Sequence, residues 1–256
     1  MSVKYKKENF QSTKEQKPLF NRYFTCKLNI KYENMLRQLF FSLDENALTY
    51  IIIICCVSWI SYKNNKNIFL GILTFIWVIW IGYWAHYLAH NDTFLNYFSA
   101  EDNIFSFNDG VHTFYKDFFH FHDKIHHNSK INKRIDYVII EILQNLFFQG
   151  FGLIALLILQ EKLLFCKNSE SKLCKSVIFF WAVFYATVHM INFNIVGSEI
   201  HKQHHINKYT NYDFDIFDII HFSKTEPVIK ENLNHTIINA VIITYLITKY
   251  KLLFNY

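Results

Sequence analysis

Five long apolar runs, separated by polar and charged stretches, constrain the fold of this chain more than any other feature. They cover residues 47–62, 68–90, 137–160, 176–197 and 236–254. A run of about 18 or more apolar residues can cross a hydrocarbon core roughly 30 Å thick, and a helix satisfies its own backbone hydrogen bonds in lipid. The pattern therefore predicts an all-α, integral membrane bundle with four to five spanning helices.

The polar stretches divide the chain into a cytoplasmic N-terminal segment, residues 1–46, and a membrane domain, residues 47–256. The N-terminal segment lacks the apolar core of a cleavable signal peptide, so we expect the first apolar run to act as the targeting signal. The net charge is +5, but the Lys and Arg residues form neither a stripe nor a nucleic-acid-binding module. We therefore expect no nucleic-acid partner.

The distribution of charge predicts how the chain is oriented in the membrane. If the N-terminus is cytoplasmic, residues 1–46, 91–136 and 198–235 face the cytoplasm, and the linkers 63–67 and 161–175 face the other side. The three cytoplasmic segments then hold about three times as many Lys and Arg residues as the two linkers. This is the bias that cytoplasmic loops of membrane proteins show.

Three histidine-rich boxes lie in the polar stretches or at their edges: residues 86–90 (HYLAH), 122–127 (HDKIHH) and 201–205 (HKQHH). Spacings of three and four place side chains on one face of a helix, about 5–6 Å apart at Cβ. Imidazole is a good ligand for zinc, copper and iron. The predicted topology brings all three boxes to the same membrane face, so we expect a cytoplasmic, histidine-rich, metal-binding cap.

Other metal and thiol chemistries fit the sequence less well. No histidine is followed by the Glu of a His-Glu-x-x-His zinc protease helix. None of the five cysteines belongs to a Cys-x-x-Cys pair, which excludes a zinc ribbon and a thioredoxin-like motif. Transport sites usually lie near the bilayer midplane, whereas these boxes lie at the ends of apolar runs. A histidine-based metal carrier or sensor without redox catalysis remains the alternative to an enzyme.

The series His-x-x-x-His, His-x-x-x-His-His and His-x-x-His-His, threaded through four or five spans, resembles the fatty acid hydroxylase and sterol desaturase superfamily. Residues 211–218 (NYDFDIFD) resemble the Asn-Tyr-Gly stretch that leads to an Asp in that superfamily. The resemblance covers about residues 86–224. It implies a membrane di-iron oxidoreductase that uses dioxygen to hydroxylate or desaturate a fatty acyl or sterol C–H bond.

The resemblance also implies a set of metal ligands made of the box histidines and one histidine of the fourth apolar run: His86, His90, His122, His126, His127, His189, His201, His204 and His205. Relatives usually carry a second histidine four residues after His189, where this chain has Phe193. Either His221 takes the open ligand position or a water molecule does. Asp213 and Asp218 are expected to orient imidazole N–H groups.

The third apolar run carries four polar residues at offsets of three, four and eight, which is one helical face: Glu141, Gln144, Asn145 and Gln149. Polar groups in a membrane are costly and usually turn toward the interior of the bundle. This face is either a polar wall near the metal end of a substrate channel or a set of interhelical hydrogen bonds that holds the bundle together.

The resemblance implies two non-haem iron ions as cofactor, with zinc as an alternative occupant in the isolated protein. The chain lacks the His-Pro-Gly-Gly signature of a fused haem domain, so a separate cytochrome or reductase is implied as electron donor. The other expected partners are a lipid substrate and the bilayer. In a eukaryotic host, we expect the endoplasmic reticulum membrane, with the boxes facing the cytoplasm.

Overall fold

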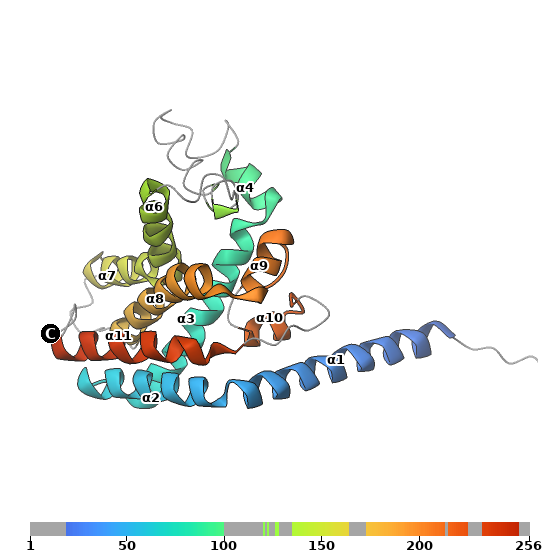
Figure 1. Ribbon diagram of the computed structural model, residues 1–256, viewed down its shortest axis with the longest axis horizontal. Coiled ribbons are helices and arrows are strands. Elements are labelled where there is room, and N and C mark those ends of the chain that lie inside the picture. Colours follow the sequence, from blue (N-terminus) through green and yellow to red (C-terminus); the bar gives the residue numbers. More distant parts are fainter. Residues whose placement is uncertain are drawn as a thin grey trace, which may run out of the picture.

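The computed structural model describes residues 19–99, 120, 122, 126–127, 135–163, 173–212, 215–224 and 232–250 (Figure 1). Within these ranges all regular structure is helical, as the apolar runs predict. The helices are α1 (Leu19–Glu45), α2 (Ala47–Lys63), α3 (Ile68–Ala89), α4 (Asp92–Ser99), α6 (Ile135–Leu146), the π-helix η2 (Phe147–Phe151), α7 (Gly152–Leu163), α8 (Lys175–Thr187), the π-helix η3 (Val188–Gly197), α9 (Glu199–Ile206), α10 (Ile216–Ile220), the 3₁₀ helix η4 (Leu233–Thr236) and α11 (Ile237–Tyr250).

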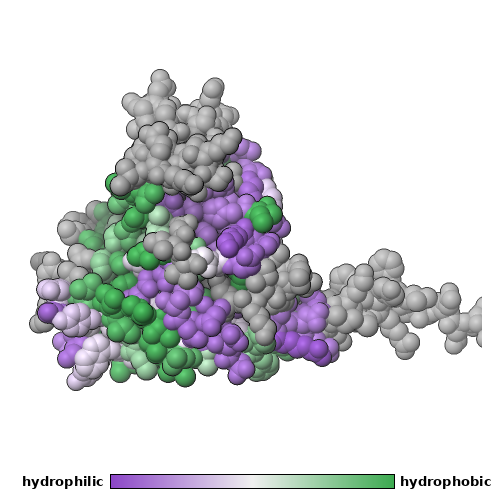
Figure 2. Space-filling view, viewed as in Figure 1, coloured by the Kyte–Doolittle hydropathy of each residue, from purple (hydrophilic) through white to green (hydrophobic). Residues whose placement is uncertain are grey.

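Three segments of the described chain are long and apolar enough to cross a membrane: Ile68–Ala89, Val138–Leu159 and Lys175–Phe193. A fourth is added if α1 and α2, which meet at an angle of 73°, form one broken span. The described part of α11 has 14 residues. Three to four spans overlap the four to five predicted only at four, and they indicate an integral, multi-pass membrane protein. The large apolar side chains that remain exposed on these helices suit contact with lipid, and Figure 2 shows apolar residues gathered over α6, α7 and α11.

Helix α8 lies at the centre of the bundle, where it contacts α2, α3, α6, α7, η2 and α11. Its aromatic side chains Phe180, Trp181 and Phe184 are almost completely buried. The Trp181 ring meets Phe75 of α3 edge-on at 5.8 Å between centroids, a favoured arrangement for aromatic pairs. A helix that is apolar on all sides belongs in the interior of a bundle, and α8 is such a helix.

A polar contact joins the third span to its neighbours in the middle of the bundle. The Gln149 side chain accepts a hydrogen bond from the Trp181 indole at 3.0 Å and donates one to the Gly82 carbonyl at 3.4 Å. A Cβ atom on Gly82 would lie 2.0 Å from the Gln149 Oε1 atom, so only glycine permits this approach. Gln149 therefore has the interhelical role that was one of the two predictions for the polar face.

The direction of the helices brings distant segments to one end of the bundle. The Cys174 N–H, just before α8, donates to Thr74 near the start of α3, so α3 and α8 run in the same direction. Glu141 of α6 meets His189, which directly follows α8 and its cap, so α6 runs in the opposite direction. As a result, the end of α3, the start of α6, and η3 with α9 all lie at the same end. The predicted topology requires this arrangement; which side of the membrane that end faces stays a prediction.

Helices α2 and α11 lie side by side along one edge of the bundle (Figure 1), and polar side chains join the start of α2 to η4, which leads into α11. The Thr49 hydroxyl donates to Asn234 Oδ1 at 2.8 Å, and the buried Asn46 side chain accepts from the Leu233 N–H at 2.7 Å. Asn46 is also the residue at which the chain bends between α1 and α2. The side chain at the bend thus has a hydrogen-bond partner, and these contacts hold the segment that leads into α11.

Candidate metal centre

Nine histidines and one carboxylate gather at the end of the bundle where α3, α6, η3 and α9 meet. Their nitrogen and oxygen atoms form several overlapping sets in which the atoms lie within 4.8 Å of one another: His86, His90, His122 and His204; His122, His126 and His127; His126, His201 and His205; and His126, Glu141 and His189. These sets contain all nine histidines implied as ligands by the sequence. Each of the three boxes contributes to the cluster.

Group one consists of His86, His90, His122 and His204, all of them buried. The ring centroids of His86 and His122 are 4.6 Å apart, and those of His86 and His204 are 4.8 Å apart. The Nε2 atoms of His90 and His204 lie 3.2 Å from each other. Two imidazole nitrogens bound to one ion at about 2.0–2.1 Å in tetrahedral geometry are separated by roughly 3.3 Å, so this distance suits two ligands of one metal ion.

Group two consists of His126, His189, His201, His205 and Glu141, which form two of the sets above with His126 in both. The Nε2 atoms of His201 and His205 are 3.0 Å apart, again the separation of two ligands on one ion. The His189 and His201 ring centroids are 4.7 Å apart, which joins the two sets. The Glu141 Oε1 atom lies 2.7 Å from His126 Nδ1 and 3.3 Å from His189 Nδ1.

The spacing of the third box explains why the two groups are adjacent. His201 and His205 are four residues apart on α9 and share one side of the helix, which faces group two. His204, which directly precedes His205 in sequence, belongs to group one instead. His127 lies between the groups, with its ring centroid 4.7 Å from that of His90 and 4.5 Å from that of His205. A single short helix can therefore supply ligands to two neighbouring ions.

Backbone carbonyls of the loop after α9 hold two rings of group one. Nδ1 of His204 donates to the Thr210 carbonyl at 2.6 Å, and Nδ1 of His86 donates to the Tyr212 carbonyl. Because a carbonyl only accepts, both rings carry their proton on Nδ1 and present the Nε2 lone pair to the cluster. Asn211, between the two carbonyls, has a φ of 56°, in the left-handed region that Asn tolerates better than most residues.

Asp218, predicted to orient an imidazole, contacts the backbone of the loop that holds the His86 ring rather than the ring itself. Its carboxylate accepts the Tyr212 N–H at 2.8 Å and the Ser223 hydroxyl at 2.6 Å, and its side chain is 1% exposed. The structure therefore links Asp218 to His86 through the backbone of Tyr212. Such indirect contacts fix a ligand ring and commonly matter for metal affinity. Asp213, the other predicted carboxylate, lies outside the described residues.

The environment favours the neutral form of five box histidines outside the membrane spans. Burial, with the neighbouring imidazoles as a further cause, holds the pKa of His122, His201 and His204 well below the usual value near 6.5. Burial also lowers the pKa of His205 to about 4. For His126, burial lowers the pKa although the Glu141 carboxylate acts in the opposite direction. A neutral imidazole is the form that binds a metal.

The donor set fits metal ions. The Nε2 atoms of His86, His122 and His126 are buried without a hydrogen-bond partner, which costs about 1–3 kcal/mol for each polar group left unsatisfied. Bound ions would satisfy these atoms together. Imidazole nitrogens with one carboxylate suit iron, zinc and copper, so geometry alone does not choose among them.

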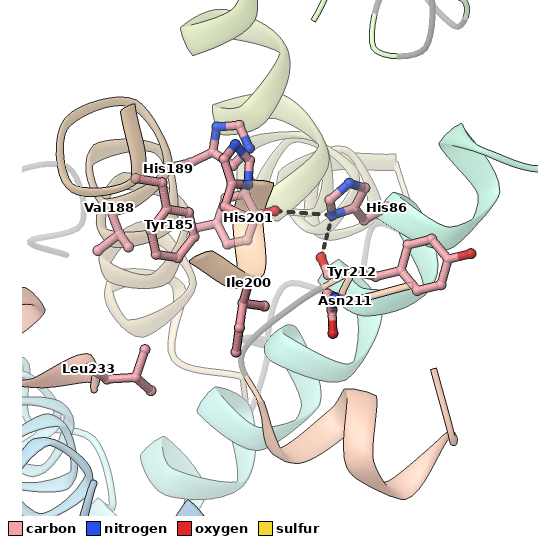
Figure 3. A pocket seen from close by; sticks show the side chains of 10 residues that line it. His86, Tyr185, Val188, His189, Ile200, His201, Asn211, Tyr212 and Leu233 are labelled. Carbon is pink, nitrogen blue, oxygen red and sulfur yellow. Dashed lines mark hydrogen bonds between the residues drawn. The ribbon is translucent and has the colours of Figure 1, made fainter. Parts of the chain in front are cut away.

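A small cavity lies between the two groups, with a volume of about 20 Å³, room for roughly one water molecule (Figure 3). His86 of group one and His189 and His201 of group two line it, together with the apolar side chains of Val188, Phe193, Ile200 and Leu233. The Tyr185 hydroxyl, 3.2 Å from His86 Nδ1, also reaches it. A small molecule in this cavity would therefore touch both groups.

His221 is placed away from the cluster. Its ring stacks on Tyr83 at 4.5 Å between centroids and meets Trp84 edge-on at 5.3 Å, and it belongs to none of the four sets found among the described residues. Whether His221 or a water molecule takes the position beside Phe193 stays a prediction, and these contacts place the His221 ring among aromatic side chains. Helix α10, which ends just before His221, packs against α1.

The polar face of the third span reaches the cluster itself. Glu141, expected in the wall of a channel, contacts two ligand candidates, and Asn145 Nδ2 lies 3.5 Å from His189 Nδ1. Gln144 is buried on the same face. Asn192, a neutral donor beside His189, is bonded instead to His235 and Asn239.

Two kinds of site residue were not foreseen from the sequence. The carbonyls of Thr210 and Tyr212 could not be, because every residue carries a carbonyl and only the loop conformation directs these two at the rings. Tyr185 offered a signal, since it lies four residues before His189 and hence on the same helical face.

Comparison with known proteins adds no relative. No protein-family model matches the chain, and neither a curated protein nor a solved structure matches it. The geometry thus identifies, on its own, a helical membrane protein with a buried multi-histidine site that can hold metal ions.

Proposed function

We propose that this protein is a membrane oxidoreductase that holds two iron ions, one in each group, and uses dioxygen to hydroxylate or desaturate a lipid C–H bond. The observation that carries the proposal is the pair of adjacent histidine groups that share one cavity at the end of an apolar bundle. The resemblance of the boxes to the fatty acid hydroxylase and sterol desaturase superfamily supports the same conclusion.

The overall reaction balances only with an external electron donor. Hydroxylation converts a C–H bond, O₂, two electrons and two protons into an alcohol and water; desaturation removes two hydrogens and releases two waters. Two bound iron ions would supply the redox chemistry needed to activate dioxygen. A separate cytochrome or reductase would deliver the electrons, and the proposed cytoplasmic orientation of the boxes, in an endoplasmic reticulum membrane in a eukaryotic host, would give it access.

The chain itself would position the ligands and the substrate. The carbonyls of Thr210 and Tyr212 hold the rings of His204 and His86 in place before any metal binds. Val188, Ile200 and Leu233 give the cavity apolar walls, and its size suits a molecule as small as dioxygen rather than a lipid segment. A dioxygen molecule held there would lie beside both groups, and the Tyr185 hydroxyl, 3.2 Å from His86 Nδ1, is a polar group within reach.

The alternative, a metal carrier or sensor, would need a polar path through the bundle. The polar face of the third span is the candidate for such a path among the described helices. Gln149 is committed to Trp181 and Gly82 in the middle of the bundle, and Glu141 lies at the cluster. This packing favours the enzyme.

Lipid analysis would test the proposal. The protein, His204→Ala and His221→Ala would be expressed in a host without endogenous lipid hydroxylases, and the lipids compared by mass spectrometry. We expect a new oxygen atom or a new double bond in one lipid class with the wild type and with His221→Ala, and its loss with His204→Ala. Unchanged lipids in every class, from protein with iron bound and a reductase present, would contradict the proposal. Rapid exchange of metal without oxygen uptake would favour the carrier.

A further inference from the structure

The two groups differ in their chemistry, because among the described residues a carboxylate lies close to the donor atoms of group two and not to those of group one. Glu141 comes from the third span, far in sequence from every histidine box, and its side chain is buried. Charged groups inside a membrane bundle are costly and usually serve a function.

We propose that Glu141 is a metal ligand of group two and takes the coordination position that Phe193 leaves open. This inference rests on the proposed function only in that metal ions bind the histidine groups. It assigns to group two a mixed imidazole and carboxylate ligand set, beside an all-imidazole set in group one.

Phe193 lies among the ligand candidates of group two. The phenyl ring stacks on the His201 ring at 5.2 Å between centroids, with an interplanar angle of 29°, and lies 6.2 Å from the His189 ring. It thus occupies space directly beside two ligand candidates while offering no donor atom. A metal ion in group two therefore takes no ligand from position 193, and any ligand beyond the four histidines must come from another element of the chain.

Glu141 lies close enough to the histidines of group two to be such a ligand. Its Oε1 atom is 2.7 Å from His126 Nδ1 and 3.3 Å from His189 Nδ1, the range of separations expected between neighbouring ligands of one ion. Glu141, His126 and His189 form one set whose donor atoms lie within 4.8 Å of one another, close enough to share a metal ion.

Charge supports the same assignment. A carboxylate buried at the end of a membrane bundle needs a positive partner, because leaving it unpaired is strongly unfavourable. Histidines that bind a metal must be neutral, so His126 and His189 cannot supply that charge while they act as ligands. A metal ion bound beside these side chains would supply it.

The test compares metal content in the purified full-length protein, loaded with iron and separately with zinc. Wild type, Glu141→Gln, and the double variant Glu141→Gln/Phe193→His would be measured by mass spectrometry of the metal per chain. Glu199→Gln is the matched control, because Glu199 is an exposed carboxylate on α9, two residues before the third box. The double variant places an imidazole beside His189 and His201. Members of the superfamily that the boxes resemble usually carry a histidine at this position.

We expect two metal ions in the wild type and in Glu199→Gln, about one in Glu141→Gln, and a return to about two in the double variant. Two ions with unchanged affinity in Glu141→Gln would overturn the inference and leave Glu141 as a residue that only positions the rings. If Glu141→Gln loses both ions, the double variant decides: recovery supports ligation, and no recovery refutes it. A wild type that binds fewer than two ions overturns the inference. One that binds two ions but oxidises no lipid leaves it intact while the proposed function fails.

Discussion

The two histidine groups are held by different parts of the molecule. Group one is fixed from outside the membrane helices, where two carbonyls of the loop after α9 accept hydrogen bonds from His86 and His204, and Asp218 holds that loop through the Tyr212 N–H. Group two is fixed from within the bundle, by Glu141 of the third span and by His189 on a π-helical turn. Substitutions in the loop should therefore affect the metal of group one, and substitutions in the third span the metal of group two.

The largest effect is expected from the neighbouring residues His204 and His205, which face different groups. His204→Ala should lose about one of two metal ions from group one, and His205→Ala about one from group two, since each removes a ligand. Combining each of these variants with Glu141→Gln shows which of the two groups each histidine serves. His204→Ala/Glu141→Gln should lose both ions, whereas His205→Ala/Glu141→Gln should lose no more than either single variant, because residues at one site are not additive.

Metal content per chain measures this directly, and retention of one ion in the single variants shows that the protein is folded. Equal loss of both ions in each single variant would mean that the histidines form one site rather than two.

Asp218→Asn should weaken group one selectively. The amide keeps the size of the side chain but replaces a charged acceptor of the Tyr212 N–H, so the carbonyl that orients His86 loses its support. Loss of such an indirect contact commonly costs about 10–100-fold in metal affinity. Competition with a chelator would report a weakened ion and an unaffected one. An equal fall in both affinities would show that Asp218 serves the fold as a whole.

Much of the fold follows from the sequence because lipid imposes a simple pattern. The second apolar run, residues 68–90, matches α3 (Ile68–Ala89), and the fourth, 176–197, matches α8 with η3 to within one residue. The third run is interrupted, with non-helical dihedral angles at Gly150 inside the π-helical turn Phe147–Phe151. Helix α1 was not foreseen either, because residues 19–45 are polar and charged as well as apolar and show no apolar run.

The histidines of the site were also predictable, because spacings of three and four act within a single helix. Contacts between distant segments were not. Glu141 and His189 lie on different membrane spans. His86 contacts a carbonyl that is 126 residues away in sequence. His221 shows the same limit in the other direction: its closeness to Asp218 in sequence suggested a ligand, but α10 directs it to Tyr83.

Asn211 tests the loop that holds group one, with a smaller effect. A β-branched residue in the left-handed region is unfavourable, so Asn211→Val should lower the free energy of unfolding by about 1–2 kcal/mol, while Asn211→Gly should change it little. Thermal unfolding in detergent, with both variants side by side, measures the difference. If the two variants behave alike, the backbone conformation at this position is not what supports the carbonyls of Thr210 and Tyr212.

The smallest effect is expected at His221. His221→Ala removes the stacking partner of Tyr83 and should lower stability by about 0.5–1.5 kcal/mol, the range for aromatic pairs. Both metal ions should remain, since the ring lies outside the two groups. Loss of one ion per chain would restore His221 as a ligand and would require α10 to lie closer to the histidines.

Anomalous X-ray scattering at the iron absorption edge, from crystals of the iron-loaded protein, tests the central claim most directly. Two separate peaks per chain are predicted. One should lie among His86, His90, His122 and His204, and the other among His126, His189, His201 and His205 with Glu141 in contact. A single peak shared by all of these side chains, or peaks away from them, would contradict the claim that the chain builds two adjacent and chemically different metal sites.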